Sequence, residues 1–145
     1  MVIAASFFQY TEAQQLQTPA PSPTTTVKQE FALSNVELNY SRPAARGRKI
    51  FGDLVPYGKV WRTGANDNTT VEFSTDVTIN GQALPAGKYG FFAIPEKNEW
   101  TLIFNKVNSE WGSFNYKVEQ DALRVKSMPM KLKTSRDTLM YEFES

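Results

Sequence analysis

Apolar residues recur at every second position in short runs between residues 36 and 143. A period of two places successive side chains on opposite faces of an extended chain, so it predicts half-buried β-strands. The runs are Val36/Leu38/Tyr40, Val71/Phe73, Val77/Ile79, Trp100/Leu102/Phe104, Leu123/Val125 and Leu139/Tyr141/Phe143. No stretch carries a sustained apolar stripe with the helical period, and the pattern therefore predicts an all-β fold with little helix.

Turn sequences separate these runs at short intervals. Asn80-Gly81 directly follows residues 77–79 and is a strong hairpin signal, because both residues accept a positive φ. Gly87 comes before residues 88–94, which are apolar on both faces and predict a central strand, so we expect a special turn geometry at this glycine. About eight strands with short connections predict an antiparallel β-sandwich or jelly roll, with a closed β-barrel as the alternative.

Composition limits the classes of chemistry that the chain can use. With 145 residues, 41% of them hydrophobic, the chain can form one domain with a substantial core. The absence of Cys and His removes thiolate nucleophiles, Cys/His zinc sites and Ser-His-Asp triads. A net charge of +1 gives no overall attraction to nucleic acid. We therefore expect no metal, no cofactor and no nucleic-acid partner, while the oligomeric state stays open.

The first 26 residues differ in composition from the rest. Residues 1–13 combine an apolar run at 2–8 with Thr11-Glu12-Ala13, which resembles a cleavage site and predicts a truncated signal peptide. A frayed terminus, or a short helix packed on the domain, is the alternative. Residues 14–26 are rich in Pro and Thr and predict a linker. We thus expect a secreted or periplasmic protein with a single β domain at 27–145 and no transmembrane segment, since a bilayer needs about 20 apolar residues.

Basic residues concentrate between positions 40 and 66. This segment holds six of the sixteen Lys and Arg residues against one acid, Asp53. Its Gly, Pro and aromatic content predicts a structured loop, where binding residues commonly gather. The planar guanidinium fork suits carboxylate, phosphate or sulfate, so the arginines are candidates to hold an anion. The alternative interpretation is that each arginine braces the loop through acids and backbone carbonyls.

Aromatic and amide side chains add a second candidate feature. Trp61, Trp111 and Tyr57 are suited to stacking on a sugar or another flat ligand, although Trp61 and Trp100 fit a core role better. The candidate ligand-binding residues are Arg42, Arg46, Arg48, Tyr57, Arg62, Asn66, Trp111 and Asn115. The spacing of the carboxylates singles out no acid–base pair, so no catalytic residue is assigned. Tyr116 and Lys117 are interpreted as a solvated surface pair.

Several segments together resemble one known family. They are residues 40–52, 54–66, 77–81, 84–89, 100–105, 111–112 and 121–125. In these segments the chain resembles a family of bacterial extracytoplasmic proteins catalogued as domain of unknown function 2911. The resemblance implies a secreted or periplasmic setting and a mostly β domain. It supplies no activity, cofactor or catalytic residue.

Three functional interpretations stay open at this point. The preferred one is a non-catalytic module that binds a small polar or anionic ligand, a saccharide or a protein partner. Its surface would be built by the 42–66 and 108–116 loops. The alternatives are a hydrolase or lyase acting on an anionic saccharide and a structural envelope component. An enzyme would need a perturbed carboxylate or tyrosine beside the arginines, whereas a structural component would show every arginine internally bonded.

Overall fold

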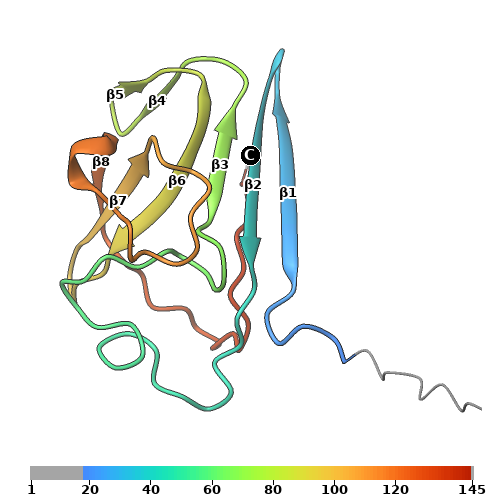
Figure 1. Ribbon diagram of the computed structural model, residues 1–145, viewed down its shortest axis with the longest axis vertical. Helices are drawn as coiled ribbons and strands as arrows, with labels where there is room; N and C mark the ends of the chain where they lie inside the picture. Colours follow the sequence, from blue (N-terminus) through green and yellow to red (C-terminus); the bar gives the residue numbers. More distant parts are fainter. Residues whose placement is uncertain (1–17, 145) are drawn as a thin grey trace, which may run out of the picture.

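The computed structural model describes residues 18–144, so the expectations for residues 1–17 lie outside the described residues. The described elements are β1 (Thr24–Phe31), β2 (Ser34–Ser41), β3 (Thr70–Phe73), β4 (Val77–Ile79), β5 (Gln82–Leu84), β6 (Gly87–Ile94), β7 (Trp100–Asn105), a 3-10 turn η1 (Val118–Gln120) and β8 (Asp121–Ser127). Six strands form one antiparallel sheet in the order β1-β2-β3-β6-β7-β8, and β4 and β5 form a separate hairpin (Figure 1). The predicted all-β antiparallel fold is confirmed, and no closed barrel forms within residues 18–144.

The central cluster of the core lies on one face of the six-stranded sheet, and Phe92 and Ile103 are buried on the opposite face. Register brings the apolar members of neighbouring strands side by side, as in the pairs Leu38 with Val71 and Phe91 with Phe104. The buried members of the central cluster are Val36, Val71, Leu84, Tyr89, Phe104, Leu123 and Val125. The β4–β5 hairpin covers this face, and its Leu84 is completely buried. The second layer of the predicted sandwich is therefore a small hairpin with adjoining chain segments.

Both turn predictions are confirmed by the backbone angles. Asn80 and Gly81 connect β4 to β5 with φ values of 49° and 78°. Gly87 begins β6 with φ at 147°, a conformation that residues with a side chain rarely adopt. Strand β6 is largely buried on both faces, as expected of a central strand.

The predicted strand at residues 139–143 is wrong. Tyr141 makes an edge-on contact with Tyr40 of β2 at 4.7 Å between ring centroids and also contacts Phe91 of β6 at 6.3 Å. Because β3 separates β2 from β6 in the sheet, a segment that contacts both lies across the face of the sheet. The alternation of Leu139, Tyr141 and Phe143 reports which side chains face the core, and it does not require a neighbouring strand.

Strand β1 begins inside the segment that the sequence assigned to a linker. Its pairing with β2 already starts at Thr24, opposite Ser41. Few apolar residues mark this strand because it lies at the edge of the sheet, where both faces are partly exposed (Figure 1). Within residues 18–144, no helix has the length and apolar character needed to span a bilayer.

The 42–66 segment is a loop, as predicted, and it closes one end of the core. The rings of Phe51, Trp61 and Trp100 form a cluster with centroid separations of 4.7 to 6.3 Å. The amide of Trp61 donates to the carbonyl of Ala93 at 2.8 Å, which attaches the loop to β6. Trp61 and Trp100 are half-buried and pack together at one end of the core, closer to the core role that the sequence favoured than to an exposed stacking surface.

Candidate functional site

The two loops expected to build a common surface lie side by side. The amide of Asn68 donates to the carbonyl of Glu110 at 2.8 Å, and the amide of Gly112 donates to the carbonyl of Asn66 at 3.0 Å. The side chain of Asn68 accepts a hydrogen bond from the amide of Glu110 at 2.9 Å. These bonds join the end of the 42–66 loop to the 106–120 loop, which connects β7 to β8.

Gly90 of β6 explains why the 106–120 loop lies where it does. A Cβ atom at this position would clash with the carbonyl oxygen of Val107 and lie 2.8 Å from the side-chain Nδ2 of Asn68. The loop therefore crosses β6 too closely for any side chain. Asn108 adds a hydrogen bond from its side chain to the carbonyl of Lys88 at 2.9 Å.

Three of the four candidate arginines donate to backbone carbonyls. Arg42 Nε donates to Leu139 at 3.2 Å, Arg46 Nη2 to Pro21 at 3.4 Å, and Arg48 to Ala44 and Ala45 at 2.8 and 2.9 Å. Within residues 18–144 none of the three forms an ion pair. Their geometry is that of braces, and of the two kinds of partner expected from the sequence they bond backbone carbonyls and no acids.

Arg62 has a different environment. Its Cζ lies 5.4 Å from the centroid of the Trp111 ring, a cation–π arrangement. Its Nε is buried and has no hydrogen-bond partner among the described residues, where the guanidinium also forms no ion pair. Burial lowers the pKa of this guanidinium, although arginine stays charged in proteins. A buried donor without an acceptor costs about 1–3 kcal/mol, which distinguishes Arg62 from the three arginines that bond carbonyls.

Two exposed aromatic rings lie beside Arg62. Trp111 is 59% exposed and Phe114 is 79% exposed, and their rings stack at 5.8 Å with an interplanar angle of 10°. Gly112 has a φ of 73°, and a Cβ there would lie 3.1 Å from the Phe114 ring and 3.3 Å from Arg62 Nη1. The glycine thus allows the guanidinium and the rings to approach each other. We call Trp111 and Phe114 the aromatic platform.

Of the remaining candidate residues, Asn66 and Asn115 lie near the platform and Tyr57 does not. Asn66 lies at the end of the 42–66 loop with a φ of 57°, where its carbonyl accepts from Gly112, while its side-chain amide donates to the carbonyl of Ser22 at 3.4 Å. Asn115 donates to the Glu110 carboxylate at 3.0 Å on the same loop as the platform. Tyr57 lies elsewhere, in a shallow hollow beside residues 96–99. The structure therefore brings Arg62, Asn66, Trp111 and Asn115 into neighbouring positions and leaves Tyr57 apart.

The family assignment follows from a match that covers most of the chain. The family model described as "Protein of unknown function (DUF2911)" matches residues 22–145. The chain belongs to the DUF2911 family. No curated protein and no solved structure matches the chain. The matched region of this DUF2911 protein includes every described strand, both loops and the platform.

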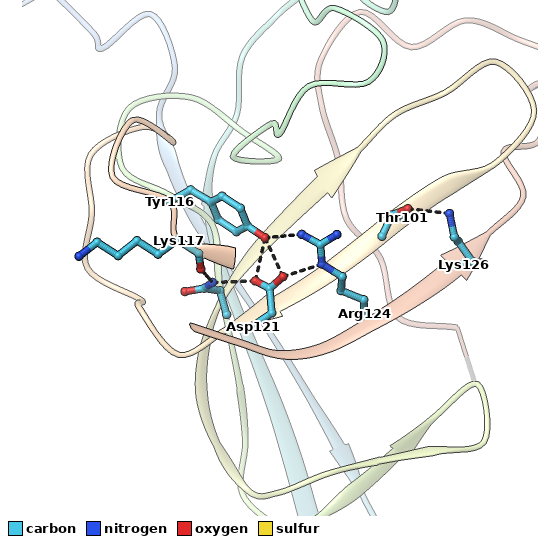
Figure 2. A network of polar contacts seen from close by, with 7 residues as sticks. Thr101, Tyr116, Lys117, Asp121, Arg124 and Lys126 are labelled. Carbon is cyan, nitrogen blue, oxygen red and sulfur yellow. Dashed lines mark hydrogen bonds and ion pairs between the residues drawn. The ribbon is translucent and has the colours of Figure 1, made fainter. Parts of the chain in front are cut away.

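A polar network anchors the 106–120 loop of the DUF2911 protein (Figure 2). Tyr116 donates to the Asp121 carboxylate, with oxygen separations of 2.7 and 2.8 Å, and accepts from Arg124 at 2.7 Å. The buried amide of Asn105 also donates to Asp121, at 2.8 Å. Burial, with the hydrogen bond to Asp121 as a second cause, raises the pKa of Tyr116 to about 12. The interpretation of Tyr116 as a solvated surface residue is therefore wrong, because its hydroxyl and its ring, which packs on Phe92, fix the loop to the sheet.

Sequence reasoning missed two features of the candidate sites of this DUF2911 protein. Phe114 carried a usable signal, since it follows Trp111 by three residues in a Gly-Ser turn. The second feature is a cleft of about 830 Å³ between the 43–65 loop and the C-terminal segment, residues 132–144. Its two walls are about 90 residues apart in the chain, and no local pattern could have joined them.

Proposed function

We propose that this protein is a non-catalytic extracytoplasmic module that binds an anionic saccharide at the aromatic platform and Arg62. Aromatic rings offer flat apolar surfaces to sugar rings, and a guanidinium fork binds carboxylate, phosphate or sulfate with two parallel hydrogen bonds. The observation that carries the proposal is the guanidinium of Arg62. It is fixed against an exposed tryptophan, has no acidic partner among the described residues and has a buried donor without an acceptor.

The contrast between the arginines supports a binding role over a structural one. A structural component was expected to bond all its arginines internally, and Arg42, Arg46 and Arg48 do so. Arg62 departs from that pattern at the place where the two loops meet. No observation favours the hydrolase or lyase interpretation, because Tyr116 and Tyr141, whose pKa values burial raises, both donate to protein oxygens.

Thermal melts with a panel of saccharides test the proposal. The panel contains sugar acids, sugar phosphates and sulfated saccharides, each beside its neutral parent sugar. We expect an anionic member to raise the melting temperature by binding the native state, and its neutral parent to do so less. Removing one charge-assisted contact costs about 1.5–3 kcal/mol, so Arg62→Ala should weaken binding by about 10- to 150-fold.

Matched variants separate binding from bracing. Lys59→Ala removes an exposed cation from the same loop and should leave the ligand-dependent shift unchanged. Arg48→Ala should lower the melting temperature through its two lost carbonyl contacts and still respond to ligand. The proposal fails if no compound shifts the parent protein, or if Arg62→Ala responds as strongly as the parent.

The extracytoplasmic setting rests on the signal-like composition of residues 1–13. Mass spectrometry of the protein isolated from native cells tests it. A mature chain that begins near Gln14 and fractionates outside the cytoplasm is expected, and an intact cytoplasmic chain would contradict the proposal.

A further inference from the structure

A cleft lies apart from the exposed rings of Trp111 and Phe114. The cleft of about 830 Å³ falls within the roughly 300–1,000 Å³ typical of small-molecule sites. One wall is formed by residues 43–65 of the 42–66 loop, and the other is the C-terminal segment, residues 132–144. Its apolar lining includes Phe51, Leu54, Trp61, Leu132, Leu139 and Met140.

The two walls are connected by backbone hydrogen bonds along one side. The amide of Ala45 donates to the carbonyl of Asp137 at 2.6 Å, and the amide of Leu139 donates to Pro43 at 3.0 Å. The Asp137 carboxylate also accepts from the amide of Arg46 at 2.9 Å. The cleft is therefore formed in the folded protein and needs no rearrangement to exist, which lowers the entropic cost of filling it.

Apolar side chains from both walls are exposed to water at the cleft. Leu54 on the loop is 54% exposed, and Leu132 on the C-terminal segment is 62% exposed. Covering apolar surface of this kind contributes about 25 cal/mol for each Å² removed from water. A ligand that contacts both walls gains this contribution from each of them.

The charges that line the cleft cancel. The lining includes three positive groups, Arg48, Arg62 and Arg136, and three negative groups, Asp137, Glu142 and Glu144. Arg136 forms an ion pair with Glu142 at 3.5 Å, and Arg48 donates to two carbonyls. A lining with equal numbers of positive and negative groups gives no net attraction for an ion.

We propose that this cleft binds an uncharged, largely apolar small molecule, at a site that borders Arg62 and does not include the Trp111 and Phe114 rings of the platform. The apolar walls supply the binding energy, and a charged ligand is disfavoured because it would disturb the Arg136–Glu142 pair and the balance of charges in the lining. Trp61, which lines the cleft, provides an intrinsic fluorescent reporter for an occupant.

Titration with N-phenyl-1-naphthylamine, an uncharged fluorescent probe, tests the proposal. We expect saturable binding with one site per chain and energy transfer from tryptophan to the probe. Leu54→Glu places a charge in the wall and should weaken probe binding by about tenfold or more. Leu33→Glu is the matched control, because Leu33 is a fully exposed leucine in the turn between β1 and β2.

Each outcome decides the proposal. Loss of probe binding in Leu54→Glu, with retention in Leu33→Glu and Trp111→Ala, supports a separate apolar site. Absence of saturable binding, or equal weakening in both leucine variants, overturns it. The anionic probe 8-anilinonaphthalene-1-sulfonate should bind more weakly. If it competes for the same site with equal affinity, the proposed preference for an uncharged ligand is wrong. If sedimentation shows a dimer that Leu54→Glu converts to monomer, a second copy covers the cleft and the proposal is wrong.

Discussion

Substituting Asp121 should destabilise the protein and loosen the loop that carries the platform. In Asp121→Ala, Tyr116 loses its acceptor and the buried amide of Asn105 loses one of its two acceptors. The ion pair with Arg124 adds little, because the Arg124 side chain is 40% exposed and exposed pairs contribute about 0–1 kcal/mol. Hydrogen bonds to a charged group contribute about 1.5–3 kcal/mol each and are not additive, which gives a loss of about 3–4 kcal/mol.

Urea and thermal denaturation, followed by circular dichroism, measure this loss. For a domain of this size we expect a fall in melting temperature of about 10 °C, from about 2–4 °C per kcal/mol. Glu119→Ala is the control, since Glu119 is an exposed acid in η1, two residues from Asp121, and should change stability by less than about 0.5 kcal/mol.

A double-mutant cycle tests whether Tyr116 and Asp121 act together. Tyr116→Phe combined with Asp121→Ala should show a coupling free energy of about 1–2 kcal/mol. An Asp121→Ala variant within about 1 kcal/mol of the parent, or additive losses in the cycle, would refute the reasoning that this carboxylate anchors the loop.

Three further outcomes are expected from the structure. Gly90→Ala should cost about 3 kcal/mol or more, because the added Cβ meets a backbone oxygen, whereas Gly47→Ala has open space around it and should cost less; urea melts of both decide this. The free energy of unfolding should fall between about pH 10 and about pH 12, because the unfolded chain releases the Tyr116 proton first, and Tyr116→Phe should reduce that fall in pH-dependent melts. A chain starting at residue 22 should melt as the parent does, whereas one starting at residue 27 lacks the first three residues of β1 and should melt lower; equal melting temperatures would contradict this role of β1.

The sequence by itself determined the strands and turns whose signals are local. Alternation at Val36 to Tyr40 and at Trp100 to Phe104 predicted β2 and β7, because burial of one face imposes a period of two. Asn80-Gly81 and Gly87 specified their turns through backbone angles that few residues accept. The basic 42–66 loop and the exposed Trp111 could also be predicted, since both follow from composition and immediate neighbours.

Only the tertiary structure decided which of the four candidate arginines has no hydrogen-bond partner for its side chain among residues 18–144. Arg42 and Arg62 look alike in sequence, yet Arg42 donates to the carbonyl of Leu139, 97 residues away, while Arg62 lies against Trp111. The same is true of residues 139–143, whose alternation is that of a strand although the segment crosses the sheet. The hydrophobic period and the composition of a segment indicate which of its side chains are buried. Hydrogen-bond partners and clefts depend on which distant segments the fold places together, and that information is not local.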